Sequence, residues 1–450
     1  MDSHDKIIPA GSRKEIDNKR IDGSCRLDPD MQPSVEKGSG VPCYSTPPPF
    51  ADEDLLAWVQ VAAGFVINFN TWGIVSSFGV FQSYYESGDL FEASSSRISW
   101  IGCTQNFLLQ LLGVVAGPAY DRGYLRQLLY AGSLLVVLGF MALSLSTKYY
   151  QAFLSQAVGI GVGAGLLFAP TVSLVSSYFS THTGLALGIA SSGSSLGGII
   201  YSVALSRLIP RVGFAWAVRV VGFITLLIFA LPLVVMRVRV HAPKPRALAD
   251  WSAFRDAPFM VFVLGVFLSF IAVPIVIFYI SFYPLNRGLT DQNLAFYIVA
   301  IFNAGSFCGR ILPNALSDRL GVFNTLAPLS VLLGLVTICL TRVSSAAGMI
   351  AGAVVAGFLT GVVIALPPVC IGVLTEDKSL IGTRVGMGFA MAGLGLLISG
   401  PVAGGILRTT TDPLDWTGVW VYGGLAACAS GLIHVCVRVM KSGLRLGVKV

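Results

Sequence analysis

The charged turn "GPAYDRGYLRQLL", Gly117 to Leu129, decides the fold that we expect from this sequence. It stands between two long apolar runs and carries an aspartate, Asp121, followed directly by an arginine. A second turn of this kind, "NALSDRLGVFNTL", begins at Asn314 and places Asp318 197 positions after Asp121. The same charged turn thus occurs twice between apolar runs, at a spacing of a little under half the chain, which predicts an internal repeat.

The composition predicts a protein that crosses a lipid bilayer many times. Of the 450 residues, 54% are hydrophobic and 12% are charged, whereas soluble proteins average about 25% charged residues. Apolar runs recur that are long enough to span a hydrocarbon core roughly 30 Å thick. The net charge of +7 comes from Lys and Arg scattered among the loops, which indicates membrane topology and not nucleic-acid binding.

Hydropathy and charge breaks divide the chain into twelve spans. The first six run roughly over residues 57–85, 98–120, 128–147, 152–179, 185–209 and 214–236, and the second six over 257–285, 294–316, 325–341, 346–374, 385–407 and 416–440. We therefore expect a disordered cytosolic tail over 1–55, an N-terminal six-helix bundle over 56–236, a cytosolic linker over 237–256, a C-terminal six-helix bundle over 257–440 and a short cytosolic tail over 441–450.

Further matches between the halves support the repeat. Pro170 matches Pro367 at the offset of the two turns, and Gly188 and Gly193 match Gly388 and Gly393 at an offset of 200. Two parallel six-helix repeats describe the halves of a major facilitator transporter. The predicted fold class is thus an all-α polytopic membrane protein with 12 transmembrane helices in two pseudo-symmetric halves. Pro170 and the pair Pro367 and Pro368 are expected to kink their helices.

Basic residues in the loops predict the orientation. With the N-terminus inside, the cytosolic loops and C-terminal tail hold fourteen Lys and Arg, and the outer loops hold seven. This bias places both termini and both charged turns in the cytosol, and we expect the plasma membrane as the location.

The two charged turns are candidates for a cytosolic latch. Surface ion pairs contribute only about 0 to 1 kcal/mol, which is weak for holding a fold but adequate for biasing two states of similar energy. The alternative is a topology signal on a solvated turn. The latch residues would be Asp121, Arg122, Arg126, Asp318 and Arg319.

Four stretches carry a family resemblance: "AWVQVAAGFVINFNTWGIVSSFGVFQSYY", "GPAYDRGYLRQLL", "SYFSTHTGLALGIASSGSSLGGIIY" and "SFCGRILPNALSDRLG". Together they resemble the monocarboxylate transporter family, especially its fungal branch, whose members are associated with carboxylates, riboflavin and exported secondary metabolites. Two positions depart from the proton-coupled animal members, because Ser76 and Ser306 stand where those have a lysine and an aspartate. The resemblance therefore implies the fold and an organic substrate, but not proton-coupled lactate transport.

Arg310 is the strongest candidate for binding substrate. It lies eight residues before Asp318, which is roughly 12 Å along a helix and close to the bilayer midplane. An arginine at that depth is costly unless it faces a wet cavity or a partner, and its planar fork suits a carboxylate or phosphate. The resemblance implies the same role, an anion-binding arginine in the eighth helix. The alternative is a side chain that snorkels to the interface.

Other polar residues are candidates for the same cavity. Asn303 and Ser306 share a helix face with Arg310. Asn70 stands in the first helix and Tyr279 in the seventh, and in this fold both helices border the cavity. Helix-to-helix hydrogen bonds and interfacial aromatics are the alternative explanations. Weaker candidates are their neighbours Asn68, Trp72, Ser76, Ser77 and Tyr283. We interpret Gln105, Asn106 and Gln110 as polar residues that pack between helices and not as ligand-binding residues.

The sequence favours transport over catalysis. The run Gly161, Gly163 and Gly165 lies inside an apolar span and so is not a dinucleotide loop, and we expect no cofactor, no metal and no enzymatic activity. The predicted function is alternating-access transport of a small organic anion, by facilitated diffusion or with proton coupling. A riboflavin or secondary-metabolite carrier or exporter is the alternative within the class, and a non-transporting nutrient sensor is the alternative outside it.

Overall fold

The computed structural model describes residues 54–179, 182–238, 249–377, 380–407 and 414–443. The described residues belong to one compact unit, residues 50–450, and every regular element in them is helical. The predicted tails lie outside the described residues except for 54–55 and 441–443, as does the centre of the predicted linker, 239–248.

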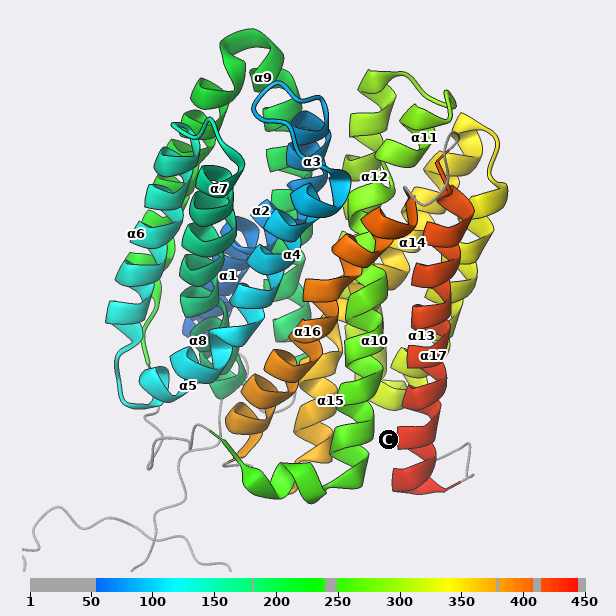
Figure 1. The fold of residues 1–450 in the computed structure, drawn as a ribbon. Helices are drawn as coiled ribbons and strands as arrows, with labels where there is room; N and C mark the ends of the chain where they lie inside the picture. The colour runs from blue at the N-terminus through cyan, green and yellow to red at the C-terminus, as the bar shows by residue number, and fades with distance from the viewer. Residues whose placement is uncertain (1–53, 180–181, 239–248, 378–379, 408–413, 444–450) are drawn as a thin grey trace, which may run out of the picture. The chain divides into compact units, whose positions relative to one another are not determined.

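The helices follow the predicted spans in order (Figure 1). In the first half they are α1 (Leu55–Asn70), α2 (Trp72–Ser76), α3 (Phe78–Glu86), α4 (Ser95–Leu111), α5 (Gly113–Asp121), α6 (Leu125–Leu143), α7 (Tyr149–Ala152), η1 (Phe153–Ile160), α8 (Gly161–Tyr178) and α9 (Thr183–Val235). In the second half they are η2 (Trp251–Arg255), α10 (Ala257–Tyr279), α11 (Phe282–Asn286), α12 (Gln292–Leu320), α13 (Val322–Cys339), η3 (Leu340–Arg342), α14 (Ala346–Ala365), α15 (Pro367–Leu374), α16 (Ile381–Leu407) and α17 (Trp416–Ser442).

Ten helical stretches of the described chain are long and apolar enough to cross a membrane. One of them, α9, has 53 residues and contains two predicted spans, because Gly213 adopts a φ of 78° between them and only glycine takes that conformation without strain. The eighth predicted span, α12, is not one of these ten stretches. Its 29 residues are long enough to cross a membrane, but they include polar side chains and Arg310. The predicted all-α polytopic fold is thus confirmed.

Several spans are interrupted where the sequence requires it. The tenth predicted span breaks at Leu366, because Pro367 starts the new helix α15 and supplies no N–H to the preceding turn. Pro170, by contrast, lies inside the continuous helix α8. The first span is divided into three helices at Thr71 and Ser77. These breaks all lie in the segments that border the cavity described below.

Two seams join the two halves: α9 runs along α12, and α4 runs along α16 (Figure 1). Small residues bring the backbones together. A Cβ on Gly188 of α9 would lie 2.8 Å from the carbonyl oxygen of Arg310, and one on Gly400 of α16 would lie 2.7 Å from Cys103 Sγ. The seams are therefore too close for larger side chains at these two positions.

Candidate substrate-binding site

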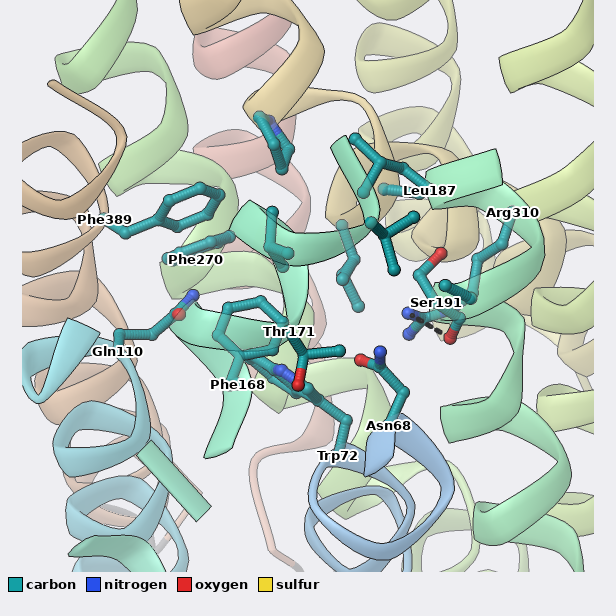
Figure 2. A pocket seen from close by; sticks show the side chains of 16 residues that line it. Asn68, Trp72, Gln110, Phe168, Thr171, Leu187, Ser191, Phe270, Arg310 and Phe389 are labelled. Atoms are coloured by element: carbon teal, nitrogen blue, oxygen red, sulfur yellow. Dashed lines mark hydrogen bonds between the residues drawn. The ribbon is translucent and has the colours of Figure 1, made fainter. Parts of the chain in front are cut away.

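A cavity lies between the two seams, and both halves of the chain contribute to its wall (Figure 2). It encloses about 570 Å³ of empty space, including the part open to solvent. The first half supplies Asn68, Trp72, Gln110, Phe168, Thr171, Val172, Val175, Leu187, Ala190 and Ser191, and the second half supplies Phe270, Arg310, Ile364, Ala365, Pro368 and Phe389. A ligand in this cavity would contact both halves, so its contacts would change when the halves move relative to each other.

Arg310 is the charged group of this wall. Its side chain is buried, with 3% of the residue exposed. Nη1 donates a hydrogen bond to the backbone carbonyl of Ser191, at 3.3 Å, and Nε donates to Ser306 Oγ, at 3.4 Å. In the described part of the chain no carboxylate pairs with Arg310. A buried guanidinium with only neutral partners favours a negatively charged ligand.

Two amide side chains of the wall have a carbonyl oxygen without a partner. Asn68 Nδ2 donates to the carbonyl of Gly64, at 2.9 Å, and Asn68 Oδ1 accepts nothing. Gln110 Oε1 is also without a donor. Both residues are buried, with 3% and 2% exposed, so their free oxygens depart from the rule that buried polar atoms are hydrogen-bonded.

Four aromatic rings form another part of the cavity wall. Trp72 and Phe168 meet edge to face, with ring centroids 5.7 Å apart, and both come from the first half. Phe270 and Phe389 of the second half are stacked, with centroids 6.0 Å apart. Flat apolar faces of this kind bind planar ligands by burial and by ring-to-ring contact.

On the side away from Asp121, the two halves are in contact beyond the cavity. There Phe78 of α3 packs on Phe278 of α10, with ring centroids 5.0 Å apart. The middle of α4 lies close to this pair, since a Cβ on Gly102 would be 2.5 Å from the Phe78 ring. On the same side Arg207 of α9 donates a hydrogen bond to the Tyr297 hydroxyl of α12. These contacts join the two halves beyond the cavity.

Two of the predicted binding residues lie beside the cavity but are not part of its wall. Ser306 accepts the hydrogen bond from Arg310 Nε. Asn303 donates to the carbonyl of Val299 and lies against Gly198 in the seam between α9 and α12. Ser306 thus positions the guanidinium, and Asn303 packs the seam.

The other two predicted binding residues lie elsewhere: Asn70 is inside its own half, and the Tyr279 hydroxyl faces Ser99 and Gln82 of the first half. Asn70 donates to the carbonyl of Thr225, at 3.2 Å, and accepts a hydrogen bond from the Tyr201 hydroxyl, at 2.6 Å. Tyr279 packs edge to face on Trp416, with centroids 6.0 Å apart. Neither residue lines the cavity.

Sequence reasoning missed Gln110, which it treated as a packing residue, together with Ser191 and three of the four aromatic residues. One signal was available for Gln110. It lies eleven residues before Asp121, whereas Arg310 lies eight residues before Asp318, so both have a similar depth in equivalent helices. The role of the Ser191 carbonyl could not be predicted from the sequence, because every residue type has the same backbone carbonyl.

The predicted latch is only partly described. Asp121 is buried, whereas Arg122, Arg126 and Arg319 are exposed, and the side chain of Asp318 lies outside what the structure describes. The latch therefore stays a prediction.

A different ionic contact fastens the chain near the start of α16. Arg384 Nε lies 2.9 Å from Asp250 Oδ2, and Arg384 Nη1 lies 2.6 Å from Asp256 Oδ2. We call this set, Asp250, Asp256 and Arg384, the Arg384 clamp. Burial would raise the pKa of Asp250, but hydrogen bonds from Ser252 and Arg384 outweigh it and hold the pKa below its usual value. The clamp ties η2 and the first turn of α10 to α16.

A polytopic helical bundle with a cavity between its two halves is the architecture expected of a membrane transporter. The chain belongs to the major facilitator superfamily, whose family model matches residues 58–377. The superfamily predicted from the repeated turns is thus confirmed, and the protein is a multi-pass membrane transporter with a small-molecule substrate.

The chain is similar to several transporters of fungi. The chain is 50% identical to "MFS-type transporter dbaD" of Emericella nidulans over 385 residues, which cover 86% of each protein. It is 36% identical to "Aspyridones efflux protein apdF" of the same organism over 391 residues, 86% of this chain and 80% of the relative. It is 36% identical to "Agnestins efflux protein AgnL12" of Paecilomyces divaricatus over 420 residues, 93% of this chain and 94% of the relative. None of these three names refers to monocarboxylate transport.

Proposed function

We propose that this protein exports a secondary metabolite that is a small organic anion, by alternating access. The observation that carries the proposal is Arg310, a buried cation without a carboxylate partner in the described chain, in an aromatic cavity shared by both halves. The efflux function in the names of two relatives supports the direction.

In the proposed cycle the anion binds to the unshared N–H groups of Arg310, and the two halves rock around it. We place both termini and both charged turns in the cytosol, and the protein in the plasma membrane. The contact between Phe78 and Phe278 is then the closed outer gate. The seam between α9 and α12 changes its angle during rocking, and the hydrogen bond from Arg310 to Ser191 lies across that seam.

Membrane potential can drive this export without a second ion. Moving one negative charge out of a negative interior releases about 2.3 kcal/mol per 100 mV. Uniport of an anion is therefore sufficient, and proton coupling is the second arrangement. Dissipating the proton gradient at constant potential stops a coupled carrier and leaves a uniporter running.

Transport in proteoliposomes tests the proposal. The panel holds short monocarboxylates, aromatic acids, riboflavin and neutral aromatic compounds, with wild type beside Arg310→Ala and beside Arg342→Ala, an exposed arginine in η3. We expect flux of an aromatic acid that collapses in Arg310→Ala and persists in Arg342→Ala.

The other outcomes identify the competing functions. Flux confined to short monocarboxylates supports a monocarboxylate transporter, which the four quoted stretches favour. Flux of riboflavin or of a neutral compound that survives Arg310→Ala removes the anion from the proposal. Saturable binding without flux in any orientation points to a nutrient sensor.

A further inference from the structure

The cavity has two hydrogen-bond acceptors that no protein donor reaches. Several buried amides of the described chain have an unpaired oxygen, including Gln82, Gln105 and Asn314 as well as Asn68 and Gln110. Only Asn68 and Gln110 among these five line the cavity. A free acceptor inside a packed helix interface is a local cost, whereas a free acceptor on a cavity wall can be satisfied by a ligand.

The orientation of the Asn68 amide is determined by its neighbour. Its Nδ2 group donates to the carbonyl of Gly64, and a carbonyl cannot accept from another carbonyl. Turning the amide over would therefore break this hydrogen bond and bring two oxygens together. Oδ1 is consequently the atom that remains for a ligand, and it requires a donor.

The wall separates these polar groups into two ends. Figure 2 shows the guanidinium of Arg310 and the amide of Asn68 on one side of the cavity, both pointing inward, and Gln110 with Phe270 and Phe389 on the other. Trp72 and Phe168 lie between them. A donor, Arg310, and an acceptor, Asn68, thus stand together at one end, and an amide stands alone at the other.

We propose that Asn68 and Gln110 select a hydroxylated planar aromatic acid. Its anionic group binds Arg310, a hydroxyl group next to that anion donates to Asn68 Oδ1, and a second hydroxyl at the far end of the ring system meets the amide of Gln110. Trp72 and Phe168 stand at 73° to each other, so one contacts the planar ligand with its face and the other with its edge. The inference rests on the proposed anion export, and it adds the substrate class and the two residues that recognise it.

The charge of the wall agrees with this ligand. The cavity-lining residues include one arginine and no carboxylate, so an ammonium group would find no counter-charge. A site built to hydrogen-bond a hydroxyl group discriminates strongly against analogues that lack it, because its own polar atoms are then left unpaired. Discrimination between a hydroxyl and a methoxyl group is accordingly the property to measure.

Equilibrium binding to the purified full-length protein tests the inference with three acids of one ring size. The probes are 3,7-dihydroxy-2-naphthoate, its 3,7-dimethoxy analogue and unsubstituted 2-naphthoate. The variants are Asn68→Leu and Gln110→Met, which keep the volume and remove the acceptor. Gln105→Met is the matched control, because Gln105 is also buried and unpaired in α4 but does not line the cavity.

We expect wild type and Gln105→Met to bind the dihydroxy acid about a hundredfold more tightly than the dimethoxy acid, which is about tenfold for each of the two hydrogen bonds lost. Each of Asn68→Leu and Gln110→Met should lose about tenfold of this preference, the share of its own hydrogen bond. Each should keep its affinity for 2-naphthoate, which also shows that the variant is folded.

Equal affinities of wild type for the dihydroxy and dimethoxy acids overturn the inference, and so does a preference that is undiminished in both variants. In either case Arg310-dependent binding of 2-naphthoate leaves the anion proposal standing. If none of the three acids binds to wild type, the anion proposal and this inference both fall.

Discussion

Arg310 of α12 donates a hydrogen bond from Nη1 to the backbone carbonyl of Ser191 in α9, at 3.3 Å, so the buried cation of one half is bound to the main chain of the other. A main-chain acceptor cannot be removed by substitution, and it moves only when its helix moves. The position of the guanidinium therefore reports the relative position of the two halves.

Replacing Arg310 should separate function from stability. A buried charge without a carboxylate partner contributes little to folding, and apolar replacements of buried ionic groups are often neutral or stabilising. We expect Arg310→Met to lower anion flux by about thirtyfold or more, equivalent to roughly 2 kcal/mol, with an unchanged or higher melting temperature in detergent. A melting temperature far below that of wild type would show that Arg310 is instead part of the folding core.

The glycine at the α9–α12 seam should tolerate no side chain. A Cβ at Gly188 would lie 2.8 Å from the carbonyl oxygen of Arg310, a backbone atom that cannot step aside. We expect Gly188→Ala to reduce flux by about tenfold, since the helices must separate by several tenths of an ångström and the site shifts with them. Gly405→Ala in α16 is the control, because a Cβ there meets nothing within 4 Å. Equal flux of the two variants would contradict the close seam.

A single substitution should lock the α4–α16 seam through a native thiol. Cys103 Sγ lies 4.0 Å from Ser399 Oγ, and the two residues belong to opposite halves. Ser399→Cys should form a disulfide under mild oxidation, because the two side chains are already within reach of that geometry. We expect flux to stop on oxidation and to return with dithiothreitol. The variant Cys103→Ser with Ser399→Cys should not respond, and full flux through a quantitatively cross-linked protein would show that the halves do not separate here.

The Arg384 clamp should make stability sensitive to acid. The pKa of Asp250 is held below its usual value in the folded protein, and the unfolded chain has a pKa of about 3.9 for aspartate. Its contribution is therefore complete above the unfolded pKa and is lost as the pH falls through the lower, folded pKa. We expect the melting temperature of wild type to exceed that of Asp250→Asn at pH 7, and the difference to shrink below about pH 4. A difference that is the same at pH 7 and pH 3 would assign the effect to packing alone.

Much of the fold could be predicted from the sequence, because apolar length and repeated charged turns are one-dimensional signals. Asp121 and Asp318 placed the second and eighth spans, and counting back from Asp318 gave the depth of Arg310. Gly213 marks the break between two spans that the structure joins as α9. These features depend on distance along the chain and on nothing else.

The wall of the cavity could not be predicted in the same way. Asn68 and Asn70 are two positions apart, yet the first lines the cavity and the second bonds to Tyr201 and Thr225 inside its own half. Gln110 likewise lines the cavity, whereas Gln105 of the same helix does not. In a helix that is apolar on all sides, hydropathy does not distinguish the face toward a cavity from the face toward another helix. The Arg384 clamp could not be predicted either, because it joins residues that are far apart in the chain.

The two neutral groups that hold Arg310 have a consequence for the unloaded carrier. In the proposed cycle the carrier also changes state with its site empty, and an arginine without hydrogen-bond partners in the membrane interior is costly. Ser306 Oγ, on the same helix as Arg310, accepts from Nε wherever that helix goes, and the Ser191 carbonyl accepts from Nη1 when the seam is closed. These neutral acceptors satisfy two N–H groups of Arg310 but leave its positive charge in place. The site is therefore charged when empty, and a bound anion would neutralise it.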